Sequence, residues 1–273
     1  MKRATVSRSL VQLAAVLLAA VVVVPFLVIV LNSLKNVRES ALFGLSLPTV
    51  WRWDNYLAVL SRAHIGRGFR NSVVISAFTV AVDCFAAALA AFVIQRRDSR
   101  PLRFTYYLFI LGLIVPVSII PTIRLMMQLA LHNTYPGIVL YYTATILPFS
   151  LFVLTGYLKS LPRELDEAVV MEGGSAWRLF GSVVVPLLMP ALVTVTIVVT
   201  STVWNDFFGP FYLISDSRKW TIILQVFSFV SQYQTNWGLV FAFMVLVILP
   251  VLVIYLVLQR SIIEGLTSGS VKG

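Results

Sequence analysis

Acidic residues and two adjacent glycines collect in one short stretch between two long apolar runs. Three carboxylates follow Pro162 closely, namely Glu164, Asp166 and Glu167. Proline is well tolerated in the first turn of a helix, and negative side chains interact favourably with the positive end of the helix dipole. Gly173 and Gly174 then predict the end of the helix. The stretch therefore predicts a short helix rich in charge, the kind of element that binds another protein.

The predicted helix has two different faces. At about 100° per residue, one face carries Leu165, Ala168, Val169 and Glu172, and another carries Glu167, Val170 and Met171. A short helix with two usable faces, held between apolar runs, can contact two elements at once. The alternative is a solvated helix that binds nothing, and periodicity by itself does not exclude it.

A second cluster combines aromatic rings with amide and carboxylate groups. It runs from Trp204 through Asn205 and Asp206 to two phenylalanines. Sugars need rings to stack on and planar polar groups to hydrogen-bond their hydroxyls, so this cluster and Tyr141 are candidates to line a substrate pathway. An aromatic belt at a membrane interface gives the same composition without a ligand.

Asp83 is the one acid inside an apolar run. A charge there is costly, which makes an ion or proton pathway one interpretation. Such a relay needs a second titratable group, and Arg124 is the only candidate. The simpler interpretation is a protonated or hydrogen-bonded packing residue. A secondary transporter centred on Asp83 is the alternative function.

Motifs for catalysis are absent from the sequence. There is no G-x-x-x-x-G-K-[ST] loop to hold ATP phosphates, and neither G-x-S-x-G nor H-E-x-x-H occurs. The single cysteine and the two distant histidines do not form a metal-binding pattern. We therefore expect no catalytic residue, no metal site and no cofactor bound by this chain, so an intramembrane enzyme has no specific support.

The composition places the chain in a lipid bilayer. Hydrophobic residues make up 59% and charged residues 12% of the 273 residues, about half the charged share of a soluble domain. The formal charge of +10 could suggest nucleic acid, but the basic residues cluster at the ends of apolar runs. Membrane topology explains that placement better, so lipid is the expected partner and nucleic acid is not.

The apolar runs predict an all-α integral membrane protein with six transmembrane helices and with the short charged helix in a cytoplasmic loop. The first span covers 10–31, after a cytoplasmic N-terminus at 1–9 and before an extracytoplasmic segment at 32–70. The core, 71–260, holds the other spans at about 71–94, 104–129, 137–158, 183–204 and 238–258, and its polar loop at 159–182 is followed by a C-terminal tail at 261–273. About 20 apolar residues suffice to cross a bilayer. Prolines predict kinks, with Pro116 and Pro121 in the third span and Pro148 in the fourth.

Basic residues set the expected orientation. The four segments placed inside the cell carry 12 Lys and Arg residues, and the outer segments carry 8. This excess favours cytoplasmic N- and C-termini, although six of the outer residues lie in one segment between Lys35 and Arg70.

The acidic stretch resembles the E-A-A-x-x-x-G loop of binding-protein-dependent ABC importer permeases. The resemblance rests on Glu167-Ala168, on Glu172-Gly173 and on Pro186 and Pro190 farther along. Further similar positions are Asn71-Ser72, Leu161 to Leu165, Trp204-Asn205 and the end of the chain from Gly265 to Gly273. Together they are similar to the smaller, maltose-type permease of the carbohydrate-uptake subfamily. Val169 replaces the usual third alanine, and Glu172 replaces the usual aspartate.

The resemblance implies a type I ABC importer permease fold in a bacterial or archaeal cell membrane, with the short charged helix as its cytoplasmic coupling helix. It implies half of a sugar translocation pathway, paired with a second homologous permease and standing on two ATPase subunits that bind ATP and Mg. An extracytoplasmic solute-binding protein would deliver an oligosaccharide or polyol. ATPase docking would involve Glu167, Ala168, Glu172, Gly173 and Gly174, with the C-terminal tail also reaching toward the ATPase.

Overall fold

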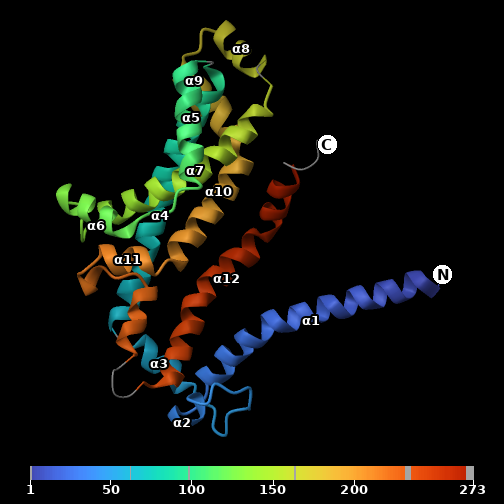
Figure 1. Cartoon of the computed structure of the whole chain (residues 1–273), viewed down its shortest axis with the longest axis vertical. Coiled ribbons are helices and arrows are strands. Elements are labelled where there is room, and N and C mark those ends of the chain that lie inside the picture. The colour runs from blue at the N-terminus through green and yellow to red at the C-terminus, as the bar shows by residue number, and fades with distance from the viewer. Residues whose placement is uncertain (1, 62, 98, 163, 231–234, 269–273) are drawn as a thin grey trace. The chain divides into compact units, whose positions relative to one another are not determined.

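The computed structural model describes residues 2–61, 63–97, 99–162, 164–230 and 235–268. Every regular element among them is a helix. The chain divides into two units, one made of residues 1–66 and 225–252 and the other of residues 67–224 and 253–273. Figure 1 shows the elements of each unit.

Four helices within the described residues are long and apolar enough to cross a membrane. Their apolar parts are Ala14–Ser33, His64–Arg96, Tyr135–Lys159 and Ala176–Asn205, and a shorter apolar helix covers Trp237–Val253. An α-helix satisfies its backbone hydrogen bonds internally, which is why such segments are stable in hydrocarbon. The predicted all-α membrane protein is thus confirmed, while the count of six crossings stays a prediction.

The first unit holds α1 (Lys2–Ser33), α2 (Val37–Ser40), α3 (Asp54–Leu60) and the first half of α12 (Trp237–Ser268). The last carbonyls of a helix lack partners within the helix, and here the Asn55 side chain donates hydrogen bonds of 2.8 and 3.1 Å to the carbonyls of Ser33 and Lys35. The Phe43 ring packs edge-on against Trp237 at 4.8 Å between centroids. The segment after α1 therefore folds as a compact cap.

Lys35 is the buried charge of this cap. It is 1% exposed, and its Nζ donates to the Gly44 carbonyl at 2.7 Å and to the Asn32 and Ser46 side chains at 3.1 and 3.3 Å. Burial lowers the pKa of Lys35, and the nearby Glu39 partly opposes that change. All three ammonium protons have a possible acceptor, as a buried cation requires.

The second unit is built on α4 (Ala63–Arg96), α7 (Tyr135–Lys159) and α10 (Val185–Asn205), with α5 (Arg100–Gly112) packed against α7. Its core consists of small and branched apolar side chains from these helices, including Ala87, Ala91, Leu151, Leu154, Val195 and Val199. Small residues let helix backbones approach closely in a membrane.

The third predicted span needs a correction. The chain does not form one kinked helix over 104–129, because α5 ends at Gly112 and α6 (Ile119–Gln128) begins seven residues later. Pro116 lies in the interruption, and Pro121 lies in the first turn of α6, where a proline is tolerated. The prolines thus separate two helices instead of bending one. Pro148 and Pro190, in contrast, lie inside α7 and α10.

Short helices connect and extend these elements. After α8 (Glu164–Met171) come α9 (Ala176–Leu179) and a π-helical turn, η1 (Phe180–Val184), which runs directly into α10. Beyond α10 lie α11 (Phe208–Leu213) and the 3₁₀ turns η2 (Ser217–Lys219) and η3 (Ile223–Ser228). Within this unit, Figure 1 places α8 and α9 at one end, far from α6 and α11.

Candidate functional site

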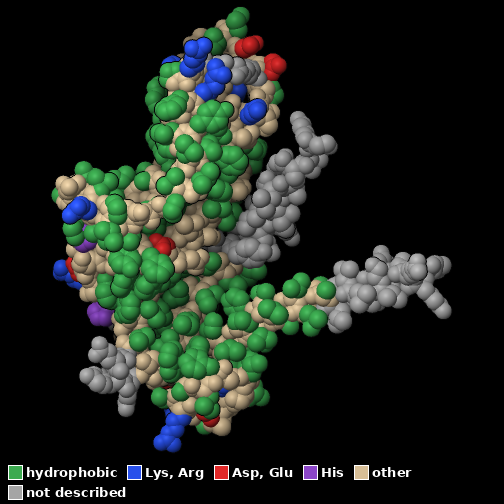
Figure 2. Space-filling model, in the orientation of Figure 1, with side chains coloured by type: hydrophobic (Ala, Val, Ile, Leu, Met, Phe, Trp, Pro, Cys, Tyr) green, Lys and Arg blue, Asp and Glu red, His purple; other side chains and the backbone are tan. Residues whose placement is uncertain are grey.

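The acidic stretch forms α8, a helix of eight residues that begins at Glu164 and ends at Met171. It starts two residues beyond Pro162, so this proline precedes the helix instead of lying in its first turn. Glu164, Asp166 and Glu167 occupy the first turn, as the dipole argument predicts. In Figure 2 charged side chains gather at the end of the unit where α8 and α9 lie.

Two glycines end the helix, each for its own reason. Gly173 has a φ of +73°, a left-handed conformation in which a side chain is strained. A Cβ on Gly174 would lie 2.5 Å from Val169 Cγ1 and 2.9 Å from the Val169 carbonyl oxygen. The amides of Gly173 and Gly174 donate 2.9 Å hydrogen bonds to the carbonyls of Val170 and Val169. This pair therefore fixes the direction in which the chain leaves α8.

One face of α8 is tied to the rest of the unit. Arg96 Nε, at the end of α4, lies 2.6 Å from Asp166 Oδ2, and the two side chains are 13% and 16% exposed. Val169 packs against the core. Among the described side chains, an ion pair and an apolar contact therefore hold the helix.

The other face is exposed and lacks a partner within the described residues. Val170 is 64% and Met171 86% exposed, and together with Asp166 and Glu167 they line a hollow of about 350 Å³. Exposed apolar side chains beside carboxylates are typical of a protein-binding surface. The predicted division of the helix into two faces agrees with this arrangement.

The remaining predicted docking residues have simple placements. Glu167 and Glu172 are both exposed, and Glu172 follows the end of α8. Ala168 belongs to α8, but its side chain lies outside the described residues. So do residues 269–273, where the C-terminal tail is expected to reach toward a partner.

Sequence reasoning missed the Arg96–Asp166 pair. A signal was available, because charge counting places the basic run after the second span and the acidic loop on the same side of the membrane. Proximity along the chain gave no indication, since 69 residues separate the two partners.

The aromatic cluster after α10 has an ordered polar centre. The Asp206 carboxylate accepts hydrogen bonds from the Tyr142 hydroxyl at 3.0 Å and from the amides of Phe208 and Gly209 at 3.1 and 3.0 Å. Tyr141 packs beside Tyr142, with 5.3 Å between ring centroids. Of the four candidate pathway residues, Asp206 and Tyr141 are thus brought together, and Asp206 orders the start of α11.

The other two candidates point elsewhere. Trp204 is buried, and its ring packs edge-on against Phe69 at 5.6 Å between centroids. Asn205 is exposed and donates a 2.8 Å hydrogen bond to the carbonyl of Ser201 in the preceding helical turn.

Asn71 and Ser72 carry a structural function that sequence reasoning did not identify. The Asn71 amide donates to the carbonyls of Arg218 and Trp220, each at 3.0 Å, and accepts from the Tyr135 hydroxyl at 3.0 Å. Ser72 Oγ accepts from the Ile222 amide at 2.9 Å. This pair of residues connects α4 to the segment that follows α11.

Asp83 is fully buried on α4. Ser150 Oγ donates a 2.5 Å hydrogen bond to Asp83 Oδ2, and Arg124 is exposed on α6. The contact with a serine of a neighbouring helix agrees with the packing interpretation.

Comparison with known proteins identifies relatives along most of the chain. Residues 83–267 match the family described as binding-protein-dependent transport system inner membrane component. The diacetylchitobiose uptake system permease protein NgcG of Streptomyces coelicolor is 33% identical over 94% of this chain and 86% of its own length. The multiple sugar-binding transport system permease protein MsmG of Streptococcus mutans is 34% identical over 92% of each chain.

A solved structure shares the fold. A chain of a bacterial ABC transporter involved in the import of the acidic polysaccharide alginate superposes with a TM-score of 0.82, at 21% identity, over 93% of this chain and 96% of that chain. This likeness concerns the fold alone. The named relatives are sugar transport permeases, so the comparisons do not support the alternative centred on Asp83.

Proposed function

We propose that this chain, which belongs to the family of binding-protein-dependent transport system inner membrane components, is the membrane permease subunit of an ATP-driven sugar importer. The named relatives are permeases of sugar uptake systems, and the apolar helices suit a subunit that stays in the membrane. Such a subunit forms part of a translocation pathway and catalyses no reaction itself.

The single observation that carries the coupling part of the proposal is the exposed face of α8. Glu167, Val170 and Met171 present one carboxylate and two apolar side chains on a helix that the Arg96–Asp166 ion pair holds in place. An anchored helix with a free contact face can transmit motion as a rigid lever. We propose that this face docks into a separate ATPase subunit, where ATP and Mg are bound.

The complete transporter then contains this chain, a second homologous permease, two ATPase subunits and an extracytoplasmic solute-binding protein. In this assembly the chain crosses the membrane six times with both termini in the cytoplasm, and the α5–α6 region completes the third crossing. The positive charge of residues 96–103 next to α4 supports this orientation.

The substrate pathway is proposed to run beside Tyr141, Trp204, Asn205 and Asp206. Asp206 supports this assignment through its three internal hydrogen bonds, which fix neighbouring aromatic rings in place. Asn205 offers an exposed amide for sugar hydroxyls.

A charge reversal at Glu167 tests the docking proposal. We expect Glu167→Lys to leave membrane insertion unchanged and to weaken ATPase binding by roughly thirtyfold, since losing a desolvated interfacial charge contact costs about 2 kcal/mol or more. Affinity of the purified ATPase subunit for the permease complex in nanodiscs measures this, together with sugar-stimulated ATP hydrolysis.

Glu164→Lys is the matched control, because Glu164 lies on the same helix but outside the hollow. Equal, small effects of both reversals would show that α8 does not dock through Glu167.

A further inference from the structure

A second cavity lies between the end of α4 and the start of α9, within the same unit as α8. Its volume is about 260 Å³, and six of its eight lining residues are apolar: Leu89, Phe92, Val93, Ala176, Trp177 and Phe180. The Phe180 ring contacts Phe92 and Trp177, with centroid distances of 5.5 and 6.2 Å. The volume is below the roughly 300–1,000 Å³ of sites that enclose a whole ligand. It therefore suits one segment of an apolar chain.

The cavity opens where two apolar stretches end. The apolar part of α4 finishes at Arg96, and that of the helix leading into α10 begins at Ala176; both residues line the cavity. Trp177 is 67% exposed, and tryptophan is enriched where hydrocarbon meets lipid headgroups. The cavity thus spans the level at which acyl chains give way to headgroups.

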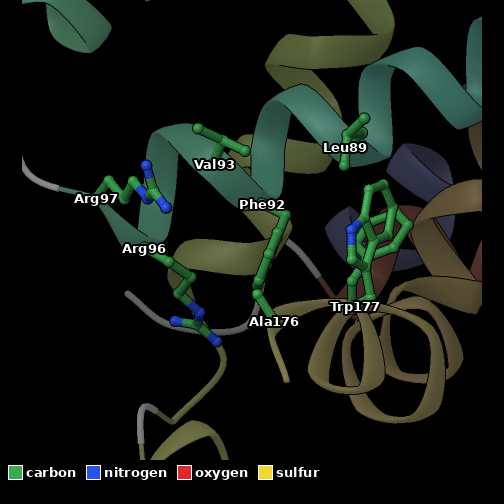
Figure 3. Close-up of a pocket in the computed structure, with 8 residues that line it drawn as sticks. Leu89, Phe92, Val93, Arg96, Arg97, Ala176 and Trp177 are labelled. Atoms are coloured by element: carbon green, nitrogen blue, oxygen red, sulfur yellow. The ribbon is translucent and has the colours of Figure 1, made fainter.

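The mouth of the cavity carries positive charge. Figure 3 shows Arg96 and Arg97 at one end of the cavity and Leu89 and Trp177 at the other. Arg96 is paired with Asp166, whereas no acidic side chain within the described residues lies at ion-pair distance from Arg97, which is exposed. Among the described residues, the Arg97 charge at the mouth is therefore available to an anion.

We propose that this cavity binds an anionic phospholipid, with the headgroup phosphate on Arg97 and the start of one acyl chain against Leu89, Phe92 and Trp177. An apolar wall with a cation at its mouth matches the two ends of a lipid, and basic pockets between membrane helices take acidic headgroups. The phosphate contacts Arg97 while Arg96 keeps Asp166, so the lipid lies next to the anchor of α8. The assignment of this cavity to the cytoplasmic leaflet rests on the proposed function. The binding chemistry does not depend on it.

Trp177 supplies a local probe for this lipid. The full chain is reconstituted in nanodiscs that contain either brominated phosphatidylglycerol or brominated phosphatidylcholine at equal mole fraction, with the other lipids unchanged. The bromine atoms quench tryptophan fluorescence, and the part of the quenching that is lost in Trp177→Phe is assigned to Trp177. We expect stronger Trp177 quenching by the brominated phosphatidylglycerol, corresponding to about fivefold local enrichment, the effect expected of one arginine near anionic lipid.

Arg97→Gln should abolish this enrichment and Arg97→Lys should keep most of it. Arg100→Gln is the matched control, because it removes the same charge from the same basic run without touching the cavity wall. Equal quenching by both lipids would overturn the proposal. So would equal loss in Arg97→Gln and Arg100→Gln, which indicates general surface attraction, or a Trp177 that neither lipid quenches, which indicates a protein partner in the cavity.

ATPase affinity, measured on the same variants, separates this proposal from the proposed function. Arg97→Gln should leave ATPase binding intact, and Glu167→Lys should leave lipid enrichment intact. Absence of phosphatidylglycerol enrichment in the unaltered chain, together with normal ATPase binding, would refute the lipid site and leave the proposed function standing.

Discussion

The ion pair between Arg96 and Asp166 should control how firmly α8 is held. The change to make is Asp166→Asn, which removes the charge and keeps the shape of the side chain. Exposed ion pairs contribute about 0.2–1 kcal/mol, and breaking a buried one costs about 3–5 kcal/mol. At 13% and 16% exposure and 2.6 Å separation, this pair lies between the two limits, and we expect about 1–2 kcal/mol.

Hydrogen–deuterium exchange of the α8 amides in nanodiscs measures this free energy directly. When local opening is fast and reversible, exchange rates follow the opening equilibrium. A loss of about 1–2 kcal/mol then accelerates exchange roughly fivefold to thirtyfold. Arg96→Gln should give a similar acceleration, and the double variant should add little to either change, because the interaction is lost only once.

Glu167→Gln separates the ion pair from the helix dipole. Both carboxylates lie in the first turn of α8 and interact with the dipole by about 0.3–1 kcal/mol, but only Asp166 contacts Arg96. Exchange that accelerates equally in Asp166→Asn and Glu167→Gln, or effects of Arg96→Gln and Asp166→Asn that add fully, would refute the anchoring role.

Three further predictions follow from other parts of the structure. Gly174→Ala should destabilise the last turn of α8 by about 1–3 kcal/mol, because the added Cβ would clash with Val169. Faster amide exchange at Val170 and Met171 would measure this loss. Gly181→Ala is the control and should have little effect, since its Cβ would meet nothing within 4 Å. Asp83→Asn should keep sugar uptake within about twofold, because an amide oxygen still accepts from Ser150; abolished uptake would mean that this carboxyl titrates during transport. Arg218 lowers the pKa of Asp216 by hydrogen bonding, so the stability that this pair gives the turn is present above the ordinary value near 3.8 and is lost as pH falls through the lowered value. Amide exchange of residues 216–219, corrected for intrinsic rates, should show this loss as the pH falls below the ordinary value near 3.8. In Asp216→Asn this pH-dependent change should vanish.

Local signals in the sequence were sufficient for several features. The acidic first turn and the two glycines predicted α8 between its observed limits of Glu164 and Met171 within a few residues. Long apolar runs predicted the membrane helices, because each such helix satisfies its own backbone whatever its neighbours are. The E-A-A type loop identified the family, which the comparisons confirm.

Local signals failed where the outcome depended on the balance between neighbouring elements. Two prolines and an apolar run could give a kinked helix or two helices, and the structure has two, α5 and α6. The sequence around Asp206 also did not reveal that its carboxylate accepts hydrogen bonds from Tyr142 and two backbone amides. Each outcome depends on side chains and backbone groups from other segments of the chain, which the sequence of one segment does not include.

By itself, then, the sequence determined which segments are helical, which of them suit a membrane and where a charged helix interrupts them, because hydrophobicity, helix capping and glycine conformation act over a few residues. Only the tertiary structure decided that Asp166 faces Arg96, that Asn71 holds the carbonyls of Arg218 and Trp220, and that α4 and α9 enclose a cavity with Arg97 at its mouth. These contacts join residues about 70 to 150 positions apart. They form when helices pack, and the energy of that packing depends on all the partners together.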